Sequence, residues 1–217
     1  MITQPAFPVR IPADSVLLEG DLTLPLNPLG VVLFAHGSGS SRHSPRNTYV
    51  AGILQQSGIA TLLFDLLTRE EDLDYATRFD IPLLTRRLLA ATAWIRQSPQ
   101  ANALKIGYFG ASTGAAAALQ AAAADPAIAA VVSRGGRPDL AGESALQRVQ
   151  SPTLLIVGGD DYGVIELNEQ ARALMRCEKK LELVPRATHL FEEPGTLEQA
   201  ARLAARWFVQ HLGTQQA

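Results

Sequence analysis

The chain has 217 residues, of which 47% are hydrophobic and 18% charged, a composition that suits a globular protein with a sizeable core. Its formal net charge of -2 provides no large basic field, which argues against a nucleic-acid partner. The single cysteine, Cys177, cannot form an intrachain disulfide.

The chain does not open with a basic segment followed by an apolar run, and no window approaches the roughly 18 apolar residues that span a bilayer. We therefore expect a cytoplasmic protein without a membrane partner. Length and composition favour a single domain over residues 1–217.

The first predicted element lies between Ser15 and Pro25, where Gly20 and Asp21 interrupt two apolar stretches and indicate an antiparallel strand or hairpin at a sheet edge. From Val31 onward, short apolar runs alternate with longer amphipathic ones. This alternation predicts an α/β fold, with a mostly parallel sheet flanked by helices.

Six further strands are each apolar enough to be covered on both faces; they are Val31–Phe34, Ala60–Phe64, Lys105–Phe109, Ala129–Val132, Thr153–Val157 and Leu181–Val184. Helices are predicted between them at Asn47–Ser57, Ile81–Arg96, Ser112–Ala124, Glu143–Val149, Ile165–Met175 and Thr196–His211. The stretch from Val132 to Thr153 holds about twenty residues, room for one helix and a loop, so no large cap domain is expected.

A G-x-S-x-G pentapeptide places Ser112 between the strand that ends at Phe109 and the alanine-rich helix. Such a turn projects the serine hydroxyl above the sheet, and Gly110 and Gly114 remove Cβ atoms that would clash there. The helix that follows directs N–H groups and a positive dipole end toward a developing anion. A helix-capping serine is the alternative, but the context favours a catalytic nucleophile.

A serine nucleophile needs a histidine to accept its proton. Of the four histidines, His36 and His43 precede Ser112, and His211 lies near the C-terminal end. His189 follows the last predicted strand on a loop, so it is the candidate base, with a surface histidine as the alternative.

A carboxylate must orient that histidine. Asp160 and Asp161 follow a predicted strand and a glycine pair, which puts both at the carboxyl edge of the sheet. Spacing alone does not choose between them.

An oxyanion hole needs two N–H donors. The residue after the nucleophile, Thr113, supplies one amide, and the loop His36-Gly37-Ser38-Gly39 supplies the other, for which we assign the amide of Ser38. We expect His36 to brace this loop by hydrogen bonding.

Together, the stretches 36–39, 110–114, 158–161 and 187–191 resemble the dienelactone hydrolase family of α/β hydrolases, over nearly the whole chain. The stretches 64–68 and 133–140 are similar to those of its small, lidless members. The resemblance implies a three-layer α/β-hydrolase fold and selects Asp161 as the acid. Dienelactone hydrolase proper uses a cysteine nucleophile, whereas this chain carries Ser112, so the resemblance does not imply dienelactone as the substrate.

These residues predict a serine hydrolase that cleaves a small ester through Ser112, His189 and Asp161, without cofactor or metal. A thioesterase, an acyltransferase or a non-catalytic ligand-binding module would share the same residues. The expected partner is a small acyl substrate, and the oligomeric state, including a homo-oligomer, stays open.

Two further features have two interpretations each. Arg134 and Arg137 either bind an acidic substrate group or satisfy loop carbonyls. The acidic segment within residues 66–80 is interpreted as a solvated connector, and the alternative is a pocket rim to which Tyr75 and Phe79 add apolar contacts.

Overall fold

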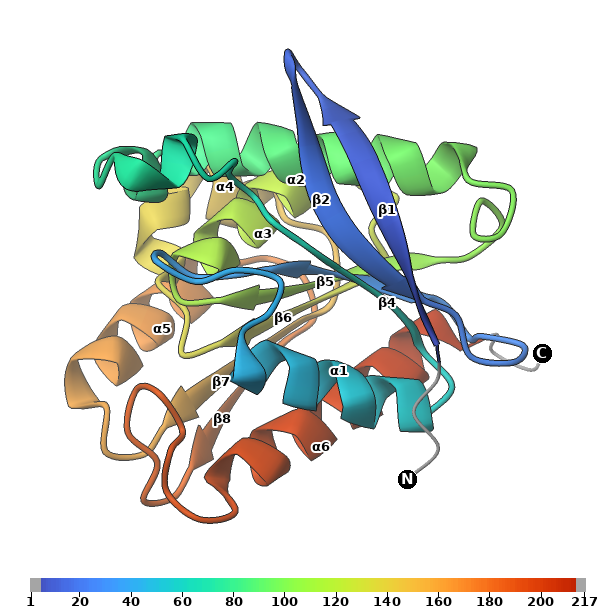
Figure 1. Ribbon diagram of the computed structural model, residues 1–217. Helices are drawn as coiled ribbons and strands as arrows, with labels where there is room; N and C mark the ends of the chain where they lie inside the picture. The colour runs from blue at the N-terminus through green and yellow to red at the C-terminus, as the bar shows by residue number, and fades with distance from the viewer. Residues whose placement is uncertain (1–4, 214–217) are drawn as a thin grey trace.

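The computed structural model describes residues 5–213, which contain a single eight-stranded sheet in the order β1-β2-β4-β3-β5-β6-β7-β8 (Figure 1). The strands are β1 (Ala6–Ala13), β2 (Val16–Thr23), β3 (Val31–Ala35), β4 (Ala60–Phe64), β5 (Ile106–Ala111), β6 (Ala130–Arg134), β7 (Thr153–Gly158) and β8 (Lys179–Val184). From β4 to β8 all neighbours are parallel, while β2 pairs antiparallel with both β1 and β4.

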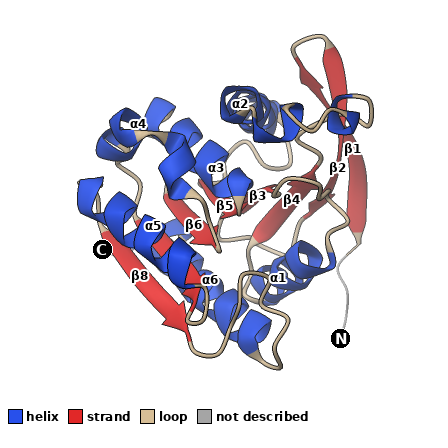
Figure 2. Cartoon of the chain, turned by 90° about the vertical axis from the view of Figure 1, so that its left-hand side faces the viewer, coloured by secondary structure: helices blue, strands red, loops and turns tan. Residues whose placement is uncertain are grey.

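Helices cover both faces of this sheet. They are α1 (Pro45–Gln56), α2 (Ile81–Gln97), α3 (Thr113–Ala124), α4 (Glu143–Arg148), α5 (Tyr162–Leu174) and α6 (Thr196–Leu212), with short 3-10 helices η1 (Glu71–Leu73), η2 (Thr77–Phe79) and η3 (Pro138–Ala141). One apolar core lies under α1 and α6, and another lies under α2, α3 and α4 on the opposite face. Figure 2 shows β1 and β8 at opposite ends of the sheet. The predicted three-layer α/β-hydrolase fold without a large cap is confirmed.

The N-terminal hairpin differs from the prediction. Its turn lies at Asp14, which has a positive φ of 52°, and not at Gly20. The sequence interpretation missed β1. In the structure β1 forms the edge of the sheet, and β2 lies inside it. Gly20 lies within β2 and pairs with Phe64 on β4, where a Cβ would lie 3.0 Å from the Cβ of Phe64, so the missing side chain lets the two strands approach closely.

The last strand was also predicted wrongly in one respect. It is not covered on both faces, because β8 is the other edge of the sheet and Val184 is its one buried residue. Lys180 and Glu182 form an ion pair on it, which suits an edge strand that meets solvent.

The alanine-rich helix α3 packs against the sheet, with most of its residues fully buried. Small side chains let it approach the sheet closely. Its central polar residue, Gln120, accepts a hydrogen bond from the Thr85 hydroxyl and donates one to the Ala141 carbonyl, each at 3.0 Å. The helix is therefore held by the sheet, by α2 and by η3.

Candidate active site

Ser112 occupies the sharp turn between β5 and α3, with φ 50° and ψ -122°. A non-glycine residue in this region stores about 1–3 kcal/mol of strain, which surrounding contacts must hold in place. A Cβ on Gly110 would lie 2.4 Å from Ala115 Cα, and one on Gly114 would lie 2.1 Å from the Ala35 carbonyl oxygen. The two glycines therefore let α3 and β3 close around the turn.

His189 and Asp161 are in direct contact. The Nδ1 atom of His189 lies 2.7 Å from Asp161 Oδ2, whereas Asp160 is exposed. Since a carboxylate accepts hydrogen bonds, Nδ1 carries the proton, and Nε2 is the ring nitrogen with a free lone pair. Ser112 and His189 line one pocket of about 210 Å³.

The loop that carries His189 is held at both ends. A Cβ on Gly158 would lie 2.3 Å from the Ala187 carbonyl oxygen, so this glycine allows the loop to cross the end of β7. The carboxylate of Glu193 accepts hydrogen bonds from the Thr188 hydroxyl at 2.6 Å and its amide at 3.1 Å. These two donors lower the pKa of Glu193.

The loop between β3 and α1 forms the opposite wall of the pocket. His36 is buried and bridges its base, because Nε2 accepts from the Leu66 amide at 3.0 Å while Nδ1 donates to the Gly37 carbonyl at 3.0 Å. Burial lowers the pKa of His36, which keeps the ring neutral. His36 therefore has the bracing geometry that the sequence suggested.

The same loop places Ser38 beside Ser112 in the pocket. Within residues 5–213 the Ser38 amide has no hydrogen-bond acceptor. Thr113 is the first residue of α3, and the first four N–H groups of a helix have no acceptor within it. Both amides are therefore available to bind an oxygen of a ligand.

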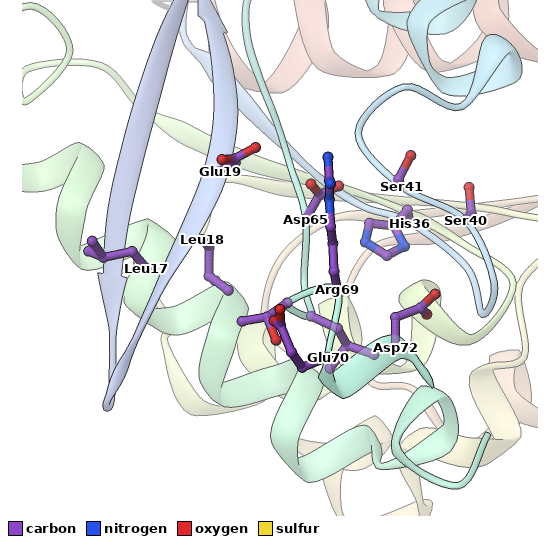
Figure 3. Close-up of a pocket in the computed structure, with 12 residues that line it drawn as sticks. Leu17, Leu18, Glu19, His36, Ser40, Ser41, Asp65, Arg69, Glu70 and Asp72 are labelled. Carbon is purple, nitrogen blue, oxygen red and sulfur yellow. The ribbon is translucent and has the colours of Figure 1, made fainter. Parts of the chain in front are cut away.

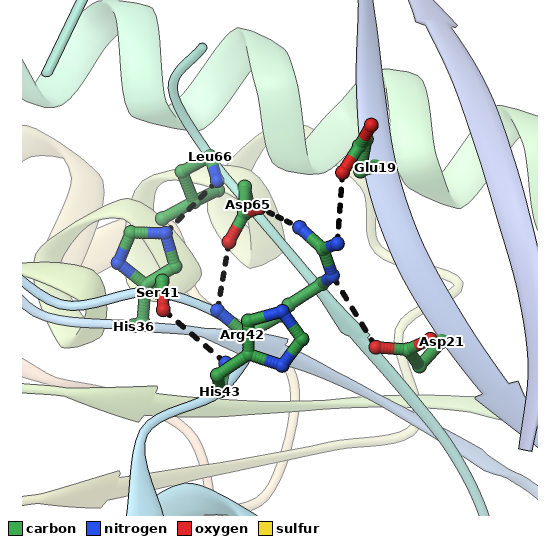
Figure 4. Close-up of polar contacts among 8 residues, drawn as sticks. All are labelled: Glu19, Asp21, His36, Ser41, Arg42, His43, Asp65 and Leu66. Atoms are coloured by element: carbon green, nitrogen blue, oxygen red, sulfur yellow. Dashed lines mark hydrogen bonds and ion pairs between the residues drawn. The ribbon is translucent and has the colours of Figure 1, made fainter. Parts of the chain in front are cut away.

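Arg42 anchors this loop to the sheet (Figure 4). Its amide donates to Asp65 Oδ1 at 2.7 Å, and its guanidinium contacts the other oxygen of the same carboxylate. The guanidinium also reaches Glu19 at 2.8 Å and Asp21 at 3.3 Å on β2. The sequence analysis missed this network, because its partners lie more than twenty residues from Arg42 along the chain.

Comparisons with known proteins identify the family of this chain. Residues 19–214 match the model of the Dienelactone hydrolase family. The chain belongs to the dienelactone hydrolase family. The crystal structure of a dienelactone hydrolase from Anabaena variabilis ATCC 29413 is 56% identical, with a TM-score of 0.92 over 95% of this chain and 98% of that one. The resemblance inferred from the motifs is confirmed.

More distant structures share the fold of this dienelactone hydrolase family member. Est1E from Butyrivibrio proteoclasticus is 16% identical, with a TM-score of 0.81 over 94% of this chain and 98% of that one. Family and fold together support a hydrolase.

Two curated Mycobacterium tuberculosis proteins, of strains CDC 1551 / Oshkosh and ATCC 25618 / H37Rv, are 59% identical over 206 residues and are provisionally named phosphoribosyl transferases. The match covers 94% of this chain and 46% of those proteins. The chain thus spans about half the length of the curated relatives, and their name belongs to the longer proteins.

A larger cavity of about 470 Å³, whose lining residues Figure 3 shows, shares Ser40 with the Ser112 pocket. It lies between β2 and the segment 66–80, and Glu19, Asp65 and Glu70 give it an acidic lining. Neither Ser112 nor His189 lines it.

The segment 66–80 has the geometry of a connector. It forms η1 and η2, and the Tyr75 and Phe79 rings lie 5.0 Å apart and contact each other. Neither ring lines the Ser112 pocket or the larger cavity. Arg78 donates hydrogen bonds to the carbonyl and the carboxylate of Asp72, so these polar contacts join η1 and η2 to each other.

The two arginines after β6 have different surroundings in this family member. Arg137 is paired with Asp139 at 2.7 Å and does not line the Ser112 pocket, whereas Arg134 is buried and does. The pocket also contains Arg46 and Asn47, which sequence reasoning missed. Ser44 followed by Pro45 was the available signal, because this pair typically begins a helix and would have placed both residues in its first turn.

Among residues 5–213, no group of three or more His, Cys, Asp or Glu side chains could hold a metal ion. Over the same residues, every helix is too short or too polar to cross a membrane.

Proposed function

We propose that this protein is a serine hydrolase that cleaves a small carboxylic ester, with Ser112 as nucleophile, His189 as base and Asp161 as orienting acid. The observation that carries the proposal is the strained turn of Ser112, which opens into the same pocket as a histidine already bonded through Nδ1 to a carboxylate. A buried turn with a positive φ and closely packed glycines is costly for a serine that only caps a helix.

In the first half-reaction, Ser112 Oγ attacks the ester carbonyl and its proton passes to His189 Nε2. The carbonyl oxygen becomes an oxyanion, which accepts hydrogen bonds from the amides of Thr113 and Ser38. When the tetrahedral intermediate collapses, the bond to the leaving alcohol breaks and His189 returns the proton to that alcohol. Asp161 stabilises the imidazolium formed in between.

In the second half-reaction, water replaces the alcohol. His189 removes a proton from the water as it attacks the acyl group on Ser112, and then returns that proton to Ser112 Oγ as the carboxylic acid leaves. The strong helix dipole of α3 begins at Thr113 and favours both oxyanions.

A fluorophosphonate probe tests the assignment, because it reacts with activated serine nucleophiles. We expect covalent labelling at Ser112, located by peptide mass spectrometry, and loss of labelling in Ser112→Ala and His189→Ala. Turnover of short-chain esters should fall in both variants by about 10⁶ in kcat if chemistry is rate-limiting.

Ser144→Ala is the matched control, since this serine is exposed on α4. It should keep both labelling and turnover. Ester cleavage at near wild-type rates in both the Ser112 and His189 variants would exclude the mechanism, and ligand binding without labelling would favour a binding module.

A further inference from the structure

Asn168 is a polar residue of α5 whose side chain is completely buried, at 0% exposure. Its Nδ2 atom donates to the Gly136 carbonyl at 3.0 Å and to the Val164 carbonyl at 2.8 Å. Because both partners are acceptors, the amide nitrogen must face them. The other amide atom, Oδ1, is buried and has no hydrogen-bond partner among residues 5–213.

Stability alone does not account for an asparagine at this position. Leucine, which has a similar size, would leave the buried Gly136 carbonyl without its donor, whereas asparagine leaves its own Oδ1 unpaired. Each choice therefore buries one unpaired oxygen, and such an atom is unfavourable in either case. What the amide adds is a fixed position for the Gly136 carbonyl.

Gly136 belongs to a loop, residues 134–137, that holds the backbone of the proposed nucleophile. The Ser112 amide donates to the Arg134 carbonyl at 3.3 Å, and the Arg137 amide donates to the Ser112 carbonyl at 3.1 Å. Gly136 lies between the two loop residues that make these bonds, so a shift of Gly136 moves both. Since Ser112 has a φ of 50°, contacts of this kind are needed to hold its strained conformation.

The same loop also contacts the histidine of the site. A Cβ on Gly135 would lie 3.1 Å from the His189 carbonyl oxygen and 3.7 Å from its Cε1 atom. The Gly135 amide donates to the Ile156 carbonyl at 2.8 Å, on the strand that leads to Asp161. The loop at 134–137 therefore lies between the nucleophile and the base and touches both.

Asn168 connects this loop to the helix that begins at the proposed acid. Asp161 is the N-cap of α5, and Asn168 lies about two turns further along the same helix. Gly136 also packs against α3, because a Cβ there would lie 2.7 Å from Ala115 Cβ. One buried amide thus joins the helix of the acid to the loop that supports the nucleophile and the base.

We infer that Asn168 is a positioning residue, which sets the distance between Ser112 Oγ and His189 Nε2 through the loop at 134–137. The inference rests on the proposed serine hydrolase and goes beyond it, because Asn168 does not line the Ser112 pocket. A displacement of about 1 Å between reacting groups lowers the rate of a chemical step by about 100-fold. Asn168 should therefore influence kcat and leave KM unchanged.

Asn168→Leu keeps the size of the side chain and removes the hydrogen bond to Gly136. With p-nitrophenyl acetate as substrate, we expect kcat to fall about 10–100-fold and KM to stay within about twofold of the wild type, because both half-reactions use the same serine–histidine geometry. Fluorophosphonate labelling of Ser112 should slow by a similar factor. The urea midpoint should stay close to that of the wild type, since one oxygen is unpaired in either protein.

Ser151→Ala is the matched control, because it also removes a buried hydrogen bond from a side chain to a backbone carbonyl. Ser151 is 2% exposed and its hydroxyl donates to the Ile128 carbonyl at 2.7 Å. It precedes β7, whereas Ser112 follows β5, so the two serines lie at opposite ends of the parallel strands. This variant should keep kcat and labelling within about twofold of the wild type even if its urea midpoint falls.

Asn168→Asp is a second variant, for the case in which leucine prevents folding. A carboxyl group buried against two carbonyl oxygens has a raised pKa, and its protonated form donates one hydrogen bond to Gly136. The kcat of this variant, divided by that of the wild type at the same pH, should therefore increase as the pH falls from about 8 to about 6.

The outcomes separate this inference from the function beneath it. If Asn168→Leu folds and keeps kcat and labelling within about threefold of the wild type, the positioning role is wrong and the hydrolase stands. A higher KM at unchanged kcat also overturns it, because Asn168 would then act on binding. If the leucine variant does not fold, a kcat ratio for Asn168→Asp that is independent of pH overturns it. If wild-type Ser112 is not labelled and no ester is cleaved, the proposed hydrolase fails and the positioning role fails with it.

Discussion

Replacing Arg134 by methionine should stabilise the protein. Burial, with a smaller contribution from Arg46, lowers the pKa of Arg134 to about 10. At about 1.4 kcal/mol per pKa unit, holding this charge inside the fold at neutral pH costs about 3 kcal/mol relative to the unfolded chain.

Two losses offset part of that gain. The guanidinium contact with Phe191, at 5.7 Å from the ring centroid, contributes about 1 kcal/mol. The hydrogen bond to Asn47 is at the long limit of 3.5 Å and contributes little. A methionine sulfur can keep an aromatic contact with the same ring. We therefore expect the free energy of unfolding to rise by about 1–2 kcal/mol, within the range measured when buried charges are replaced by apolar groups.

Urea unfolding followed by the fluorescence of Trp94 and Trp207 measures this change. The midpoint should rise at an unchanged m-value, and Arg137→Met, a paired surface arginine, should stay within about 0.5 kcal/mol of the wild type. A lower midpoint for Arg134→Met at equal m would mean that the guanidinium stabilises the empty fold, which would refute the reasoning.

Three other changes have defined outcomes. Asp161→Asn should lower kcat/KM for short esters about 10³–10⁴-fold while Asp160→Asn changes it less than about threefold, because Asp161 is the carboxylate against the histidine. Gly114→Ala should cost more than about 3 kcal/mol in urea unfolding or prevent folding, since its Cβ would meet backbone at 2.1 Å, whereas Gly52→Ala has open space and should be neutral or stabilising. Burial lowers the pKa of His36, so below about pH 6.5 the unfolded chain binds a proton that the folded protein does not. The free energy of unfolding of the wild type should therefore fall by up to about 1.4 kcal/mol per pH unit in that range, and that of a His36→Gln variant should fall less when urea unfolding is measured at the same pH values.

The parallel part of the fold could be predicted from the sequence because each strand is a short apolar run bounded by turn residues. The N-terminal hairpin could not, because β1 alternates Pro8, Arg10 and Pro12 with apolar residues and lies at an edge where solvent accepts them. The same reasoning explains β8, whose polar side chains are compatible with an edge position but not with burial on both faces.

Some residues of the candidate site could be predicted from a local motif, and others could not. Ser112 and its two glycines form a local motif, so their turn was predictable from five consecutive residues. The choice of Asp161 over Asp160 came from family resemblance, since both follow the same strand and only the path of the His189 loop distinguishes them. The strong constraint on that path is Gly158, whose missing Cβ lets the loop cross.

The sequence predicted least well which arginines are paired with carboxylates. Arg42 and Arg134 are both arginines next to loops that shape the pocket, yet the first contacts three carboxylates and the second contacts none among the described residues. Nothing near either arginine in the sequence distinguishes them, because the partners of Arg42 come from other strands of the sheet. The fold neutralises Arg42 with three carboxylates but leaves Arg134, in the Ser112 pocket, without one, which lowers stability at that position. Replacing Arg134 by an apolar residue of similar length should therefore raise the free energy of unfolding.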